Sequence, residues 1–275
     1  QADSHRQAGV CRLARTLGRM DVDQLFDQAL AHMERTVHVL ARRVPPPQEV
    51  PCKDGFFFRH TEKSVHQALV QKLARMVSTL HAARLLMEHG FVQEQASLQR
   101  MLDEIQEDIH FLGLGVIFGK WSDLHQKYLD AFFEEEFDAE TATESTQKRP
   151  MIPRSRIRAW IANAEAAALD PSTGINLSRT ISKTYSGYVH AASPHIMDMY
   201  GGNPPHFHMR GLAGTPRQFE HRADLWNLFY RGILAFGTCA KAFGDDLLFE
   251  NIRQFADAFA KQSGKNYQSD LWGAT

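Results

Sequence analysis

Apolar residues recur every three or four positions over most of the chain, which is the spacing of one face of an α-helix. This pattern predicts helices at about 21–43, 62–89, 93–118, 122–137, 154–169, 177–192, 217–243 and 246–262. Segments that alternate between apolar and polar residues, which would indicate strands, are scarce. The sequence therefore predicts an all-α fold, a single helical-bundle domain of about eight helices.

Breaks in the pattern suggest how the chain is divided. VPPP ends the first helix and is followed by an expected loop, RVPPPQEVPCKDGFFFRH; Gly90 ends the second helix, and Ser122 is a good N-cap for the fourth. The polar segment 138–153 contains prolines and is expected to be an exposed linker. Neither half looks self-sufficient, so one helical domain is predicted over 21–262, between an Arg-rich segment at 1–20 and a frayed tail at 263–275.

Composition narrows the functional classes. The 275 residues include 31 basic and 32 acidic side chains, a balance that argues against binding nucleic acid through bulk charge alone. Three scattered cysteines form neither a disulfide framework nor a thiolate zinc site, and they favour a reducing cytoplasm as the location. No apolar run approaches the roughly 20 residues that span a bilayer, so no membrane partner is expected.

An arginine lies within an apolar helical stripe in the segment 62–89. Leu73, Met76 and Leu80 belong to this stripe, Arg84 projects inside it, and Glu88 lies at its edge four residues later. A guanidinium on a core-facing stripe needs a carboxylate or several carbonyl groups, and Glu88 can supply one. Two interpretations stay open: a structural pair that orients helices, or one wall of a buried site.

The next helix carries the acidic run DEIQED. Asp108 falls at the edge of its apolar stripe and is expected to meet Arg84 across a helical hairpin. The other acidic residues, Glu104, Glu107 and Asp103, project progressively further outward in that order. They are expected on a solvated face.

The stretch KTYSGYVHAAS places Lys183, Ser186 and His190 on one polar stripe of a predicted helix. A cation, a hydroxyl and an imidazole in this arrangement suit acid–base chemistry on a phosphodiester. In this hypothesis the imidazole moves a proton, the cation stabilises phosphate charge, and the hydroxyl orients the phosphate or a water. The alternative is that His190 only caps or packs.

Histidines also raise the question of a metal site. His206 and His208 alternate in the loop that follows GGNPP, and together with His190 they are candidate ligands. Glu107 and His110 form one ExxH unit, but di-iron helix bundles use two such units with further glutamates. A solvated or hydrogen-bonding loop is the better interpretation, and no cofactor is expected.

Two segments resemble a known family. AARLLMEHGFVQEQASLQRMLDEIQEDIHFL is similar to the central helical hairpin of the bacterial all-helical domain-of-unknown-function family 5677, and YSGYVHAAS resembles its Tyr-x-x-x-x-His signature at a late helix end. That family is in turn similar to the HEPN superfamily, in which many members are toxin-like or antiviral ribonucleases. The resemblance implies RNA as substrate, chemistry without a metal, and a homodimer.

The match departs from the HEPN pattern at its cation. HEPN ribonucleases use an arginine and a histidine spaced Rx4–6H, whereas here Lys183 precedes His190 with the spacing Kx6H. Lysine supplies a point charge without the planar fork of arginine.

The function expected from the sequence is a cytoplasmic prokaryotic defence or toxin-like protein that acts on RNA. His190, Lys183 and Ser186 are its expected catalytic residues, above a buried polar floor of Arg84, Glu88 and Asp108. Two alternatives remain: a non-enzymatic helical binding module, and a metalloprotein that uses histidines and carboxylates.

Overall fold

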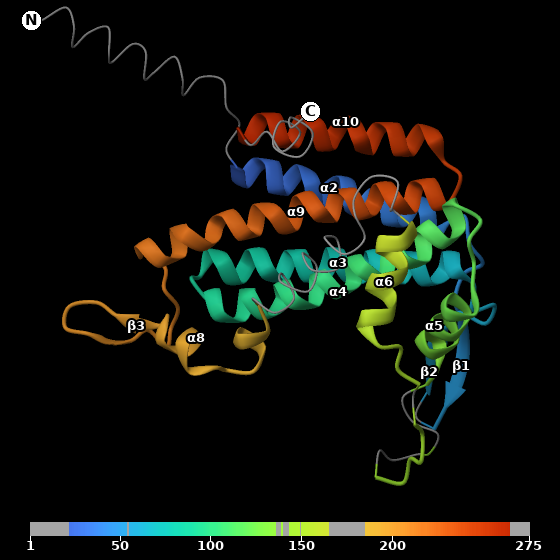
Figure 1. Cartoon of the computed structure of the whole chain (residues 1–275), viewed down its shortest axis with the longest axis horizontal. Coiled ribbons are helices and arrows are strands. Elements are labelled where there is room, and N and C mark those ends of the chain that lie inside the picture. Colours follow the sequence, from blue (N-terminus) through green and yellow to red (C-terminus); the bar gives the residue numbers. More distant parts are fainter. Residues whose placement is uncertain are drawn as a thin grey trace, which may run out of the picture.

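The computed structural model describes residues 22–53, 55–135, 139, 143–148, 150–164 and 185–264. It confirms an all-α, single-domain helical bundle (Figure 1). The long helices are α2 (Val22–Ala41), α3 (Val65–Glu88), α4 (Val92–Ile117), α9 (Pro216–Ala242) and α10 (Asp246–Ser263). Shorter helices are α5 (Asp123–Phe133), α6 (Arg154–Ala164) and α8 (Ser193–Met197).

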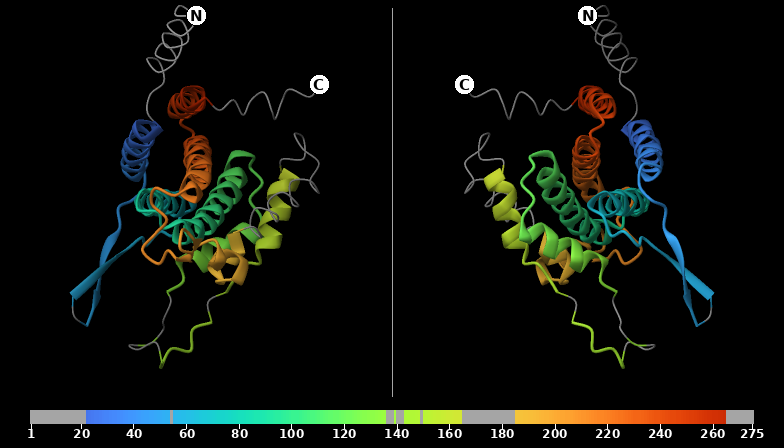
Figure 2. Two further views of the ribbon diagram at one scale, coloured as in Figure 1. Left: turned by 90° about the vertical axis from the view of Figure 1, so that its left-hand side faces the viewer. Right: turned by 90° about the vertical axis from the view of Figure 1, so that its right-hand side faces the viewer.

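The five long helices run side by side, and the smaller elements lie at the two ends of the bundle (Figures 1 and 2). Helices α5 and α6 and a β-hairpin lie at one end, and α8 lies at the other. The hairpin pairs β1 (Gln48–Cys52) with β2 (Gly55–Arg59), and a two-residue ladder pairs β3 (Tyr200–Gly201) with β4 (His206–Phe207). No helix in the described ranges has the length and apolar character needed to cross a lipid bilayer.

The core forms where the apolar stripes of the long helices meet. Phe26 of α2 stacks on Phe229 of α9 with ring centroids 4.4 Å apart, and both rings are almost completely buried. Leu73 and Leu80 of α3 are fully buried in the same core. Aromatic and aliphatic burial of this kind supplies most of the driving force for folding.

Capping residues set where two helices begin. Ser64 is the N-cap of α3: its hydroxyl accepts a hydrogen bond from the Gln67 amide, and the Gln67 side chain accepts one from the Ser64 amide. This reciprocal capping box starts the helix at Val65, three residues later than the apolar pattern alone suggests. Ser122 is the N-cap of α5, as predicted, and its backbone N–H donates to His125 Nδ1 at 3.2 Å.

The expectation of a loop between the first two helices was wrong. The segment forms the β1–β2 hairpin, whose turn leads into Gly55 with a φ of 148°. A short turn containing glycine between extended residues is a hairpin signal that helical periodicity does not detect. Phe56, Phe57 and Phe58 lie exposed on β2.

The second half of the chain differs from the prediction mainly at its loops. Only the end of the helix predicted at 177–192 is described, and it is helical from Tyr185 to Val189. The short helix α8 follows, introduced by Pro194 in its first turn. Residues 139, 143–148 and 150–153 of the predicted linker are described, and these residues form neither helix nor strand.

A close backbone crossing ties the loop before α9 to the tip of the α3–α4 hairpin. The amide of Leu212 donates to the Gly90 carbonyl at 2.7 Å. Gly90 has a φ of 75°, and a Cβ placed there would lie 2.1 Å from the backbone nitrogen of Ala213. Glycine is therefore required at position 90 for its left-handed conformation and for its lack of a side chain.

We predict that Gly90→Ala lowers the free energy of unfolding by more than about 3 kcal/mol, because backbone strain and overpacking add. Gly119→Ala is the matched control: Gly119 has a φ of 60°, but a Cβ added there would meet nothing within 4 Å. That control should cost only the strain, about 1–2 kcal/mol. Urea-induced unfolding of both variants measures the difference, and equal losses would contradict the crossing.

Candidate functional site

One face of α4 carries buried polar residues in a single row. Gln95, Gln99 and Asp103 follow at intervals of four residues, so they lie above one another on the helix surface. All three are buried, with 0%, 3% and 4% of their surface exposed. Arg231 of α9 faces this row and places its Nη1 2.7 Å from Asp103 Oδ1.

Tyr185 joins this row from the segment that precedes α8. The Gln99 side chain hydrogen-bonds to its phenol, and burial, with the nearby charges of Asp224 and Asp103, raises the pKa of Tyr185 far above its usual value. We name the group of Gln95, Gln99, Asp103, Tyr185, Asp224 and Arg231 the α4–α9 polar cluster. It brings residues from three separate parts of the chain together.

Several polar atoms of the cluster make no hydrogen bond within the described structure. They are both amide atoms of Gln95, the amide oxygen of Gln99 and Oδ2 of Asp103. A buried polar atom without a partner costs about 1–3 kcal/mol. Such atoms in a native protein call for an explanation, and one explanation is that they bind a polar group during function.

A second set of polar contacts borders the cluster near α8. Tyr188 donates a hydrogen bond to Asp198 at 3.3 Å, and Asp198 also pairs with Arg217 at 3.3 Å. Burial, followed by the charge of Asp198, raises the pKa of Tyr188 to about 12. His221 lies 3.2 Å from Asp224 and so connects this border to the cluster.

The acidic run on α4 is largely covered, so the expectation of a solvated face was wrong. Asp103 is buried beside Arg231 of α9, and Glu107 pairs with Arg158 of α6 at 2.7 Å. Burial, followed by the charge of Glu107, raises the pKa of Asp103, and the charges of Arg231 and Arg100 only partly oppose this effect. The helices that cover this run, α6 and α9, come later in the chain. A helical projection of α4 alone shows which residues share a face but not which other helices pack against that face.

Asp108 holds a buried ion-pair network on the side of α4 that faces α3 and α6. Lys72 Nζ lies 2.8 Å from its Oδ2, and Arg154 Nη1 lies 2.5 Å from its Oδ1. Burial favours the neutral carboxyl, but the two positive charges more than offset it and lower the pKa of Asp108.

The predicted Arg84–Glu88 pair is present, with Nε and Oε1 2.9 Å apart, and Arg84 also pairs with Asp27 of α2. The expectation that Asp108 meets Arg84 was wrong. Asp108 lies beside Lys72, and Arg84 follows twelve positions after Lys72, or about 18 Å along α3. The three residues therefore do not form one floor.

The catalytic candidates around His190 are only partly described. Lys183 lies outside the described residues. Ser186 is half-buried, His190 is exposed, and the His190 amide donates to the Ser186 carbonyl at 3.1 Å across one helical turn. His190 therefore lies five residues after Tyr185, directly after the described helical residues 185–189.

The metal candidates do not gather into a site. The rings of His206 and His208 are 4.3 Å apart, and His206 Nδ1 lies 2.9 Å from the Pro204 carbonyl oxygen. Among the described residues, no group of three or more His, Cys, Asp or Glu could hold a metal ion. In the ExxH unit, Glu107 pairs with Arg158, while burial and the charge of Arg231 lower the pKa of His110 to about 4.

Replacing each of the two buried aspartates of α4 by a neutral residue should have opposite effects on the free energy of unfolding at pH 7. The pKa of Asp103 is raised in the folded protein. Its stabilising contribution is therefore complete below pH 3.8, the ordinary pKa of an aspartate, and is lost as the pH rises through the folded-state pKa. Asp108 has a lowered pKa, so its contribution is present above 3.8 and is lost as pH falls through the folded-state value.

We therefore expect Asp103→Asn to leave the free energy of unfolding unchanged or to raise it. Asp108→Asn should lower it by about 3–5 kcal/mol, because Lys72 and Arg154 then lose their buried counter-charge. Chemical denaturation at pH 7 tests both variants side by side. Equal destabilisation would mean that the Arg231 pair outweighs the cost of burying Asp103.

Comparison of the sequence and the structure with known proteins gives no match from which a function could be inferred. No family model matches the sequence, and no curated protein or solved structure matches the chain. The function must therefore be argued from named residues and their geometry.

Proposed function

We propose that the protein acts on RNA as a metal-independent ribonuclease, with His190 as the general acid or base. The observation that carries the proposal is the position of the Tyr-x-x-x-x-His segment. Tyr185 is held by the α4–α9 polar cluster, while His190, one short segment later, is exposed. A polymeric substrate can reach an exposed imidazole that sits on a fixed support.

The chemistry needs only groups that RNA and the chain supply. A base removes the proton from the ribose 2′-hydroxyl, the resulting oxygen attacks the adjacent phosphorus, and the 5′-oxygen leaves and takes up a proton. The products are a 2′,3′-cyclic phosphate end and a 5′-hydroxyl end. His190 performs one of the two proton transfers, and Lys183 and Ser186 are proposed to stabilise and orient the phosphate.

Arg84, Glu88 and Asp108 receive a different role in this proposal. Two of them join helices: Arg84 connects α3 to α2 through Asp27, and Asp108 connects α4 to α3 and α6, while Glu88 pairs with Arg84 within α3. We propose that these residues hold the helices that support the site and do not touch the RNA.

A second candidate function is a helical module that binds a small polar ligand without chemistry. The unpaired polar atoms of Gln95, Gln99 and Asp103 favour it, since a planar ligand with hydrogen-bond donors and acceptors satisfies amides and a carboxylate together. In that case substitutions in the cluster alter ligand binding, and His190→Ala has no effect.

We expect His190→Ala to reduce the rate of RNA cleavage by about 100- to 10,000-fold, because positioned proton transfer contributes that much. His38→Ala is the matched control, since His38 is an exposed histidine of α2. The measurement is cleavage of a labelled oligoribonucleotide in the presence of EDTA. A substrate with a single 2′-deoxyribose at the cleavage position should remain intact.

Three outcomes decide between the candidates. Cleavage that survives EDTA and is lost in folded His190→Ala supports the proposal. Cleavage that EDTA abolishes contradicts the metal-independent reaction and returns attention to the histidine loop. No cleavage by the wild-type protein leaves the binding module as the better account.

A further inference from the structure

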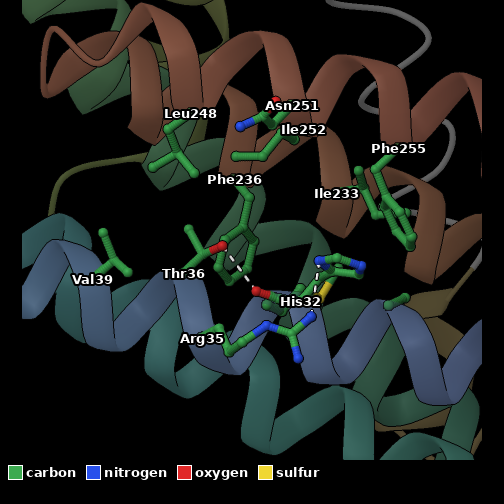
Figure 3. A pocket seen from close by; sticks show the side chains of 12 residues that line it. His32, Arg35, Thr36, Val39, Ile233, Phe236, Leu248, Asn251, Ile252 and Phe255 are labelled. Carbon is green, nitrogen blue, oxygen red and sulfur yellow. Dashed lines mark hydrogen bonds between the residues drawn. The ribbon is translucent and has the colours of Figure 1, made fainter.

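A cavity of about 400 Å³ lies between α2, α9 and α10 (Figure 3). Helices α2 and α10 lie on the side of the bundle away from α4 (Figure 2). Ile233 and Phe236 of α9 lie at the back of the cavity, between the walls formed by α2 and α10. The lining residues are Ala29, His32, Met33, Arg35, Thr36 and Val39 of α2, Ile233 and Phe236 of α9, and Leu248, Asn251, Ile252 and Phe255 of α10. Its volume is within the usual range for small-molecule sites, about 300–1,000 Å³.

The polar residues that line this cavity are His32, Arg35 and Thr36, which lie on one turn of α2, and Asn251 of α10. Arg35 Nη2 lies 3.1 Å from His32 Nδ1, and the Thr36 hydroxyl donates to the His32 carbonyl at 2.8 Å. Burial, followed by the charge of Arg35, lowers the pKa of His32, so the imidazole is neutral at pH 7 and accepts a hydrogen bond from the guanidinium. Figure 3 shows this turn facing Leu248 and Asn251 across the opening.

The charge at the cavity has one sign. No lining residue is acidic, and Arg35 makes no ion pair with a carboxylate in the described ranges. Elsewhere in the same ranges, arginines such as Arg43, Arg84 and Arg158 are paired with carboxylates. An arginine fork that keeps donors available beside an apolar cavity matches a ligand with a carboxylate and an apolar body.

We propose that this cavity binds a small amphipathic carboxylate, with its apolar body between α2 and α10 and its carboxylate on the Arg35 guanidinium. Thr36 and Asn251 are the neutral polar groups that line the same cavity. The apolar body would cover Phe255, Ile252 and Leu248, which are only half-buried in the free protein. The proposal does not depend on the action on RNA, because the two sites share no residue.

Titration calorimetry of the full chain with straight-chain carboxylates tests the proposal. Hexanoate, octanoate and decanoate should bind with one-to-one stoichiometry. Each added CH₂ that enters the cavity should strengthen binding by about fourfold, which corresponds to about 0.8 kcal/mol. Decanol, which has the same apolar body without the charge, should bind at least tenfold more weakly than decanoate.

Two variants with a control separate the ligand site from nonspecific adsorption. Arg35→Gln should weaken decanoate binding at least tenfold and leave decanol binding unchanged. Arg42→Gln is the control, because it removes a positive charge just beyond the end of α2 and outside the lining of this cavity. Asn251→Trp should fill the opening and weaken both ligands while the circular dichroism spectrum stays that of the folded protein.

The proposal is overturned if decanoate does not bind with saturation, or if decanol binds as tightly as decanoate. It is also overturned if Arg35→Gln and Arg42→Gln weaken decanoate equally, since a general charge effect then explains the binding. Unchanged binding in Asn251→Trp would place the ligand elsewhere on the protein.

Discussion

The buried charge of Asp108 is the constraint on which the arrangement of α3, α4 and α6 depends. A carboxylate with 4% of its surface exposed is tolerated only beside compensating charge, and here Lys72 and Arg154 supply it from two different helices. Sliding either helix by one turn would move its cation about 5.4 Å away. The ion pairs therefore fix the register of these helices, and the register in turn positions the opposite face of α4, where the polar cluster lies.

That opposite face explains why a site can exist on a helix that is otherwise part of the core. Helix α4 packs against α9 on one side and against α3 on another. Polar residues at both edges of its apolar stripe are therefore buried: Asp103 beside Arg231 of α9, and Asp108 beside Lys72 of α3. Asp103 and Asp108 have similar exposure but opposite pKa shifts, because burial outweighs the charges of Arg231 and Arg100 at Asp103, whereas the charges of Lys72 and Arg154 outweigh burial at Asp108. The balance between burial and neighbouring charge, more than the depth of burial alone, therefore distinguishes the two carboxyl groups.

The sequence was sufficient to predict where the helices lie along the chain. It was insufficient to predict which other helices cover their polar residues. Periodicity predicted α2, α3, α4, α9 and α10 to within a few residues, and it also predicted the Arg84–Glu88 pair, because these depend on local spacing. It missed the burial of Asp103 and the role of Arg231, because α9 is far away in sequence. The row Gln95, Gln99 and Asp103 was nevertheless visible as a polar residue at every fourth position, a signal that is informative even beside an acidic run. The β1–β2 hairpin was missed because a search for helical spacing does not test for a glycine turn.

The stacking of Phe26 on Phe229 has a consequence for how the protein is made. The first ring is synthesised near the beginning of the chain and its partner near the end. At about 5–20 residues per second, α2 leaves the ribosome roughly 10–40 s before α9 follows. During that interval the apolar face of α2 has no native partner from α9. Exposed apolar surface of this kind promotes aggregation until α9 emerges.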